Sequence, residues 1–151
     1  GRTLKAVIPG GSSVPIMTAA ETEDCLLDYE GVVARGSMLG SAGMIVMDDS
    51  TDMVYQIWRL ARFYAHESCA QCTQCREGTA WTTKILERIL AGKGKEADLD
   101  LLLSLSENMT GKTICVLSDS CAAPIVSGIA KFRSALDACL SGARQPALAM
   151  A

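Results

Sequence analysis

Long hydrophobic runs are missing from this sequence. Hydrophobic residues make up 49% of the 151 positions, yet no run approaches the roughly 18 consecutive apolar residues that a membrane-spanning helix requires. The first residues also lack the apolar core and small-residue cleavage site of a secretory signal, and they read GRTLKAVIPGG. We therefore expect a soluble chain. Because this start is typical of the inside of a domain, we also expect the chain to belong to a longer polypeptide.

Histidine and basic residues are scarce as well. A single histidine leaves little room for general acid-base catalysis, and no Ser-His-Asp set is visible. The net charge is -3, with 14 basic against 17 acidic residues, and no basic stripe interleaved with aromatics is present. Nucleic-acid binding is therefore disfavoured. The glycine-rich segments at 9–13 and 36–43 fit neither a dinucleotide fingerprint nor a P-loop, so they predict turns with positive φ rather than a substrate pocket.

The chain changes character near residue 50. Residues 1–49 are rich in glycine, serine and β-branched residues, and runs at 4–8 and 43–47 favour strands. From Ser50 onward glycine thins out and helical periodicity replaces it. We therefore expect an α+β chain, in which a small β-containing unit precedes a helical one.

The helical part predicts a compact four-helix bundle. The first helix should begin at a cap formed by Ser50 or Thr51 and run to about residue 66. The second should follow Gly78, with Trp81 facing inward, and end near residue 92, and the third should span about 96–108. The last helix should start near SDSCAAP, with Pro124 in its first turn, and carry four apolar residues inward: Ile125, Ile129, Phe132 and Leu136. Residues 141–151 show no periodicity and predict a flexible tail.

Cysteine, in contrast, is abundant. The chain has seven, an odd number that rules out complete pairing within the chain, and three of them stand within seven residues in HESCAQCTQCREG. This clustering favours a metal site in a reducing compartment over a disulfide scaffold. Cys69, Cys72 and Cys75 have the C-x2-C-x2-C spacing that supplies three of the four ligands of an iron-sulfur cubane. Glu67 and Ser68 offer side-chain acceptors that could cap this segment.

The fourth ligand must come from elsewhere in the chain. Cys115, in GKTICVLSDS, is the best candidate because its neighbours are small or polar and a helix start is predicted just after it. Backbone N–H groups at such a turn can donate to cluster sulfides. Cys121 is the competitor, and we rank it below Cys115. Positive charge near the motif would favour thiolate ligation, and it comes from Arg59, Arg62, His66 and Arg76.

Other interpretations of the cysteines stay open at this point. Zinc could be held by the three clustered cysteines with Cys115 or His66, although zinc modules usually offer two separated pairs. We favour His66 as a polar residue at a helix end over a metal ligand. A redox-sensing thiol domain would form reversible disulfides and hold no metal. Cys139 is expected in the core, and Cys25 has no partner in the sequence.

Three segments together resemble a known family, and they read LKAVIPGGSSVP, HESCAQCTQCREGT and GKTICVLSDS. They are similar to the NADH-oxidising FMN flavoprotein subunit of respiratory complex I and to its relatives in NAD-reducing hydrogenases and NAD-dependent formate dehydrogenases. The resemblance runs from residue 1 to about 140. It implies that residues 1–49 form the C-terminal part of a β-grasp-like (soluble-ligand-binding-type) domain, and that residues 50–140 form a helical [4Fe-4S]-binding bundle.

The resemblance also implies a function. In that family the positions of Cys69, Cys72, Cys75 and Cys115 ligate one [4Fe-4S] cluster, which takes electrons one at a time from reduced FMN and passes them along an iron-sulfur chain. FMN and NAD(H) bind to an N-terminal part that this chain lacks, so alone it should not turn over NADH. The implied partners are a thioredoxin-like [2Fe-2S] subunit and a further iron-sulfur subunit, in a peripheral arm in the cytoplasm or mitochondrial matrix.

The sequence departs from the family pattern at a few places. The family usually has glycine at Ala70 and proline at Gln74, and small residues with a tryptophan after the fourth ligand, where this chain reads SDSCAAP. Cys121 therefore stands where the family needs no cysteine, and we interpret it as a bystander. The resemblance also implies that the region of Leu117 and Ser118 approaches the flavin edge in the whole subunit.

Overall fold

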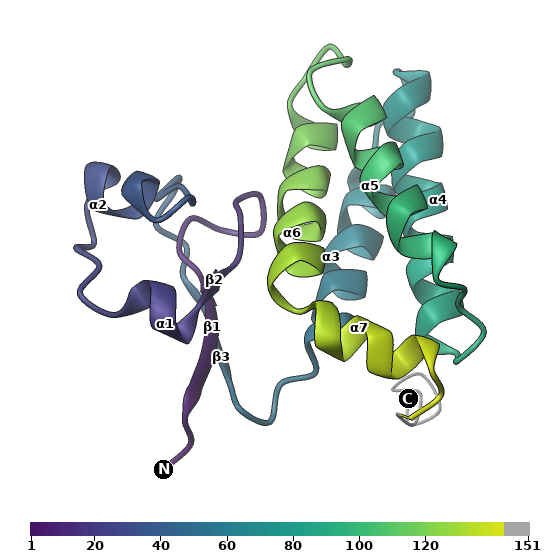
Figure 1. Cartoon of the computed structure of the whole chain (residues 1–151). Helices are drawn as coiled ribbons and strands as arrows, with labels where there is room; N and C mark the ends of the chain where they lie inside the picture. Colours follow the sequence, from purple (N-terminus) through teal and green to yellow (C-terminus); the bar gives the residue numbers. More distant parts are fainter. Residues whose placement is uncertain (144–151) are drawn as a thin grey trace. The chain divides into compact units, whose positions relative to one another are not determined.

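The computed structural model describes residues 1–143 (Figure 1). Residues 144–151, which belong to the predicted tail, lie outside the described residues. The chain divides into two compact units, Gly1–Thr51 and one that begins at Asp52. Antiparallel strands in the first unit and helices in both make this an α+β fold, as predicted. None of the helices in the described part is long and apolar enough to cross a membrane.

The first unit is built on a three-stranded antiparallel sheet of order β2-β1-β3. The central strand β1 spans Leu4–Ile8, β2 spans Met17–Thr18 and β3 spans Ile45–Asp48. The last three residues of β1, from Ala6 to Ile8, are buried. The predicted strands at 4–8 and 43–47 correspond to β1 and β3, whereas two-residue β2 is too short to give an alternating pattern. The assignment of this sheet to a β-grasp-like domain stays a prediction.

Two short helices follow β2 in the first unit, and each is fixed by a side-chain cap. Helix α1 spans Ala19–Thr22, where Thr18 and Glu21 form a capping box. Helix α2 spans Tyr29–Ala34, and the Asp28 carboxylate accepts the backbone N–H of Gly31 at 2.6 Å.

The glycine-rich segments form the predicted turns. Gly11, Gly36 and Gly40 have φ values of +83°, +76° and +50°, which only glycine adopts without strain. A Cβ at Gly10 would lie 2.4 Å from the carbonyl oxygen of Met38, so the two segments can approach each other only because Gly10 has no side chain.

The second unit is a bundle of four helices, with a short fifth helix across one end (Figure 1). Adjacent helices are joined by short turns. Their bounds are Met53–Glu67 for α3, Thr73–Leu90 for α4, Ala97–Met109 for α5, Leu117–Lys131 for α6 and Arg133–Leu140 for α7. The core between them is made of fully buried aliphatic side chains: Val54, Ile57, Leu86, Ile89, Leu99, Leu102, Ile125 and Leu136.

The starts of two helices and the place of Pro124 within a third differ from the predictions. Asp52, not Ser50 or Thr51, caps α3, because its carboxylate accepts the backbone N–H of Tyr55 at 2.9 Å. Helix α4 begins at Thr73, inside the cysteine run, rather than after Gly78. In the last predicted helix, Pro124 lies well inside α6 instead of in its first turn. Packing of α6 against α3 and α5 outweighs the one backbone hydrogen bond that a proline forfeits.

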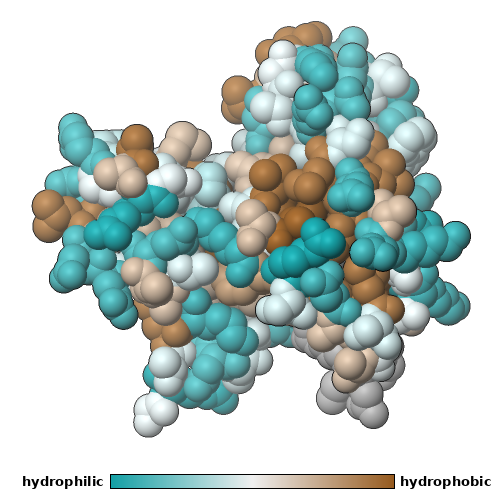
Figure 2. Space-filling model, in the orientation of Figure 1, coloured by the Kyte–Doolittle hydropathy of each residue, from teal (hydrophilic) through white to brown (hydrophobic). Residues whose placement is uncertain are grey.

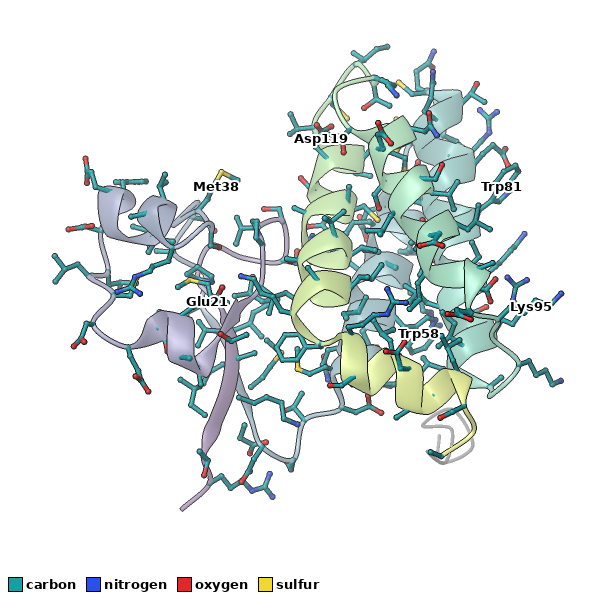
Figure 3. The ribbon with its side chains drawn as sticks, in the orientation of Figure 1. Glu21, Met38, Trp58, Trp81, Lys95 and Asp119 are labelled. Atoms are coloured by element: carbon teal, nitrogen blue, oxygen red, sulfur yellow. The ribbon has the colours of Figure 1, made fainter. Side chains whose placement is uncertain are left out.

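Two further predictions about the bundle are corrected. The last predicted helix is two helices, because the chain bends at Phe132 and α7 carries Leu136 into the core separately. Trp81 was expected to face inward but is 53% exposed and lies at the surface of the bundle (Figure 3). Exposed apolar surface also gathers on the α5 and α6 side seen in Figure 2. The exposed apolar side chains of these two helices include Leu101, Leu103 and Val126.

Candidate metal centre

The three clustered cysteines lie where α3 passes into α4. Cys69 is exposed in the short loop between the helices, Cys72 is the N-cap residue of α4, and Cys75 is buried in the first turn of α4. No side-chain hydrogen bond caps α4 at Cys72. The unpaired backbone N–H groups of a helix N-terminus carry partial positive charge, which favours thiolates placed there.

Hydrogen bonds hold the loop of this motif at both ends. The Ser68 hydroxyl accepts the backbone N–H of Ala70 at 3.3 Å and lies 3.4 Å from the Cys75 sulfur. The Arg76 guanidinium donates to the carbonyl of Ala70 at 2.8 Å. Ser68 thus caps the segment as predicted. Ala70 itself has a φ of +63°, the left-handed region that a side chain disfavours.

Cys115 lies in the turn between α5 and α6, and one hydrogen bond joins this turn to the cysteine motif. The backbone N–H of Ile114 donates to the Cys72 sulfur at 3.4 Å, across 42 positions of sequence. Thr113 fixes the turn from within, since its hydroxyl donates to the Cys115 carbonyl at 2.8 Å and lies 2.6 Å from the Ser118 hydroxyl. Cys115 itself is exposed.

Ser118 and the two residues beside Cys115 differ sharply in exposure. Ser118 is fully buried, and its hydroxyl donates to the Met109 carbonyl at 3.2 Å. Ile114 and Val116, in contrast, are 85% and 74% exposed. The turn thus presents two apolar side chains outward while Ser118 ties it to the bundle. The predicted approach of Leu117 and Ser118 to a flavin stays a prediction.

The two segments that carry the four predicted ligands are joined by the hydrogen bond from Ile114 to Cys72, but their side chains are not arranged around a common point. Among residues 1–143, no group of three or more Cys, His, Asp or Glu side chains is arranged to hold a metal ion. The set still fits an iron-sulfur cluster in chemistry, because such clusters take cysteine thiolates and backbone N–H donors to sulfur. The Ile114 hydrogen bond supplies such a donor. Ligation by all four requires the sulfur atoms to come closer together.

The other three cysteines lie in different surroundings. Cys121 is fully buried in α6, and burial, with a smaller contribution from the nearby Cys75, raises the pKa of its thiol to about 12. Cys139 is buried in α7, as predicted, and burial raises its pKa too. Cys25 is half-buried in the first unit.

The predicted positive charges divide into two groups. Arg76 lies in the motif and also forms an ion pair with Glu77 at 3.0 Å. Arg59, Arg62 and His66 are exposed on the outer side of α3. His66, the single histidine, lies in the last turn of α3, at a helix end as predicted.

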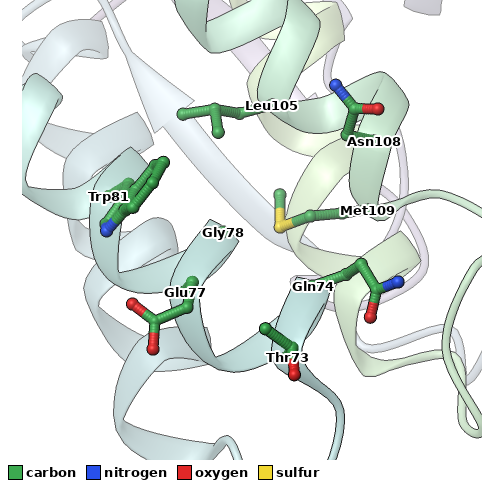
Figure 4. Close-up of a pocket in the computed structure, with 8 residues that line it drawn as sticks. All are labelled: Thr73, Gln74, Glu77, Gly78, Trp81, Leu105, Asn108 and Met109. Carbon is green, nitrogen blue, oxygen red and sulfur yellow. The ribbon is translucent and has the colours of Figure 1, made fainter.

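A mainly apolar hollow of about 350 Å³ opens between α4 and α5 beside the motif (Figure 4). No substrate pocket was expected from the sequence, because neither glycine-rich segment fits a phosphate-binding motif and a single histidine leaves little room for catalysis. Trp81 lines this hollow, and Gly78 lets α5 approach closely, since a Cβ there would lie 2.4 Å from the Met109 sulfur. The remaining lining residues are Thr73, Gln74, Glu77, Leu105 and Asn108.

Comparison with known proteins identifies relatives by sequence. An NADH-quinone oxidoreductase subunit from Rhizobium meliloti (strain 1021) is 48% identical over 134 residues, which cover 89% of this chain and 31% of the relative. The corresponding NADH-quinone oxidoreductase subunit from Rickettsia bellii (strain OSU 85-389) is 47% identical, with 89% and 32% covered. The chain thus spans about a third of the length of these curated relatives.

Solved structures with a similar fold are also found. A chain of an NAD⁺-reducing [NiFe]-hydrogenase in the H2-reduced state superposes with a TM-score of 0.82 and 34% identity, covering 92% of this chain and 24% of that one. For the air-oxidised state the TM-score is 0.74 and the identity 30%, with 97% and 28% covered.

A family model matches residues 55–139, more than half of the chain, and its description is the NADH-ubiquinone oxidoreductase-F iron-sulfur binding region. The matched range holds the C-x2-C-x2-C run, Cys115, most of α3 and the whole of α4, α5 and α6. The chain therefore belongs to the family of the NADH-ubiquinone oxidoreductase-F iron-sulfur binding region.

Proposed function

We propose that this chain relays electrons one at a time through a [4Fe-4S] cluster held by Cys69, Cys72, Cys75 and Cys115. One observation supports this most directly: the Ile114 N–H donates to the Cys72 sulfur and so joins the turn of the fourth cysteine to the other three. Both segments lie inside the range of the iron-sulfur family model. Cys121 is the weaker candidate for the fourth position, because it is a fully buried thiol within α6.

The residues of the chain have distinct parts in this proposal. When bound, the cluster supplies one-electron redox chemistry. The bundle fixes Cys75 in its buried position, and Ser68 and Arg76 hold the loop that carries Cys69. The Ile114 N–H, as a donor to sulfur, stabilises negative charge there and would raise the reduction potential.

The wider electron path is also part of the proposal. Electrons would come from reduced FMN after NADH oxidation, and both of these molecules would bind to a part of the whole subunit that this chain does not match. They would leave toward a thioredoxin-like [2Fe-2S] subunit and a further iron-sulfur subunit. The relatives named as NADH-quinone oxidoreductase subunits and NAD⁺-reducing hydrogenase support such an assembly, with the chain in its cytoplasmic or matrix-side peripheral arm.

The test is the iron, zinc and acid-labile sulfide content of the chain after anaerobic purification. We expect about four iron atoms and about four sulfides per chain, together with a broad visible absorption that reduction bleaches. About one zinc per chain without sulfide would contradict the proposal and favour a zinc-stapled helical interaction module. Reversible disulfides with no metal would instead favour a redox-sensing thiol domain.

A further inference from the structure

Helix α3 has two clearly different faces. One face is buried in the bundle against α4 and α6, and its residues include Val54, Ile57 and Ala61. The opposite face carries Arg59, Arg62, Phe63 and His66 at helical spacing, and all four are exposed. Residues three and four apart on a helix are neighbours, so these four form one continuous stripe. We call them the α3 stripe.

The α3 stripe lines a shallow hollow of about 310 Å³. Its one aromatic side chain, Phe63, is 49% exposed and lies between Arg62 and His66 along the helix. No basic stripe interleaved with aromatics was expected from the sequence, and this short stripe on α3 corrects that expectation. The hollow thus offers an apolar floor with cationic edges. From Arg59 to His66 the stripe extends roughly 10 Å, at 1.5 Å per helical residue.

The two guanidinium groups of the α3 stripe have no acidic partner within residues 1–143. No hydrogen bond or ion pair joins Arg59 or His66 to a described side chain, and the Arg62 guanidinium only stacks over the Trp58 ring at 5.4 Å. The only acidic residue in α3 is Glu67, at its very end. The chain as a whole has a net charge of -3, so this positive face is a local feature and not a result of composition.

We propose that the α3 stripe is a docking surface for an acidic segment of a partner protein. Carboxylates of the segment would pair with Arg59 and Arg62, and an apolar side chain between them would cover Phe63. An extended segment advances about 3.3 Å per residue, so three or four residues match the length of the stripe. The stripe offers only two guanidinium groups, so it suits a short acidic segment better than a long polyanion such as nucleic acid, whose binding draws on many basic contacts.

The α3 stripe lies close to the cysteine motif, and this position suggests what docking would achieve. Helix α3 ends at Glu67, and only Ser68 separates it from Cys69. A segment seated on the stripe would therefore hold its protein next to the cysteine motif, where an electron acceptor has to be. This purpose rests on the proposed function, whereas binding of the acidic segment does not.

The test uses the full chain and a fluorescein-labelled peptide, Glu-Glu-Leu-Glu-Glu-Leu-Glu-Glu, followed by fluorescence anisotropy at low salt. We expect the double variant Arg59→Gln, Arg62→Gln to bind the peptide about fivefold more weakly, as two lost exposed ion pairs predict. The matched control, Lys84→Gln with Lys93→Gln, removes the same charge from exposed positions in α4 and in the turn after it, and should change binding less than about twofold. Phe63→Ala should weaken the binding of this peptide but should not change the binding of a version with glycine in place of leucine.

Four outcomes would overturn the proposal. Equal weakening by both double variants would mean that net charge alone attracts the peptide. Full displacement by equimolar inorganic pyrophosphate would indicate a small-anion site, and tighter binding of a single-stranded oligonucleotide of equal charge would indicate a nucleic-acid surface. Iron and sulfide content, measured on the same preparations, separates the two proposals: normal iron with no peptide binding contradicts only the docking, and peptide binding without iron contradicts only the electron relay.

Discussion

Ala70 is the residue at which the cysteine loop carries backbone strain. Its φ of +63° lies in the left-handed region, which costs an L-residue with a side chain roughly 1–2 kcal/mol. The loop tolerates this because Ser68 and Arg76 both bond to the backbone of Ala70. The family resemblance gives glycine at this position, and the geometry supplies the physical reason.

We therefore expect Ala70→Gly to stabilise the apo chain. Removing the strained side chain should raise the free energy of unfolding. Part of this gain is lost because glycine has more backbone entropy in the unfolded state, so we expect a net increase of about 0.5–1 kcal/mol. Urea denaturation followed by circular dichroism measures it. Ala130→Gly, on the exposed side of α6, is the matched control and should lose up to about 1 kcal/mol. A similar loss at both positions would show that Ala70 is not strained.

Serine variants of Cys72 and Cys121 distinguish a proposed cluster ligand from a cysteine that is not expected to bind the cluster. Cys72→Ser should abolish iron binding, because it removes a proposed ligand whose sulfur accepts the Ile114 N–H. Cys121→Ser should keep about four iron atoms per chain. Iron content and visible absorption after anaerobic reconstitution report both. Loss of iron from the Cys121 variant with retention in a Cys115→Ser variant would reverse the assignment of the fourth ligand.

Helices α4 and α5 are held together at one end by a glycine contact. A Cβ at Gly78 would lie 2.4 Å from the sulfur and 2.6 Å from the Cγ of the buried Met109 side chain. Because Met109 is 1% exposed, it has little room to move aside. The close approach of the two helices thus depends on the absence of a side chain at residue 78.

Gly78→Ala should consequently destabilise the chain by about 1–3 kcal/mol through overpacking, in spite of the better helix propensity of alanine. Chemical denaturation of a double-mutant cycle with Met109→Ala gives the measurement. In the Met109→Ala background the same substitution should be neutral or stabilising by up to about 1 kcal/mol. An unchanged cost in both backgrounds would contradict the packing argument.

At the other end, α4 and α5 are joined by an ion pair. Asp98 is 4% exposed, the Arg88 guanidinium donates to both of its carboxylate oxygens, and the Lys95 backbone N–H donates at 2.8 Å. Burial alone would raise the pKa of Asp98, but the hydrogen bonds from Arg88 and Lys95, with the charge of Arg88, together lower it below its usual value.

A carboxylate with a lowered folded-state pKa stabilises the fold above its unfolded pKa of about 3.9 and loses this contribution as the pH falls through the folded-state pKa. Asp98→Asn should therefore cost about 2 kcal/mol at pH 7, and the difference from the wild type should shrink below about pH 4. Denaturant titrations at several pH values measure it. Asp137→Asn breaks the exposed pair with Arg133 and should cost less than about 0.5 kcal/mol. Equal costs would show that burial of Asp98 has no role.

At the scale of the whole molecule, the chain is two units with separate cores. Since the proposed ligands all lie beyond residue 52, metal loading should act on one unit only. We expect iron-sulfur reconstitution to increase the hydrogen-exchange protection of amides around residues 68–75 and 110–118, with no change in the amides of β1 and β3. Mass spectrometry of peptic peptides resolves these segments. Equal protection gained in the sheet would contradict independent units.

Local sequence signals predicted the helices of the bundle more fully than the start of α4 or the position of Trp81, whereas the cysteine ligand set stays a prediction. Periodicity located α5 within about a residue at each end, because Leu99 and Leu102 lie on its buried face, although Leu103, also expected inward, is exposed. It failed at Gly78, because glycine usually interrupts helices and only the tertiary contact with Met109 explains its place inside α4. The Ile114 hydrogen bond could not be predicted, since it joins residues 42 positions apart.

The short passage between α3 and α4 has a consequence for how this segment can change in length. Helix α3 ends at Glu67, so only Ser68 stands between it and Cys69, and α4 begins immediately after Cys72. One inserted residue would either rotate everything after it by about 100° on the helix or break the Ser68 and Arg76 bonds that close the loop. The segment can therefore vary by substitution but not by insertion or deletion, and the fixed count of residues between its cysteines is set by the helices on either side.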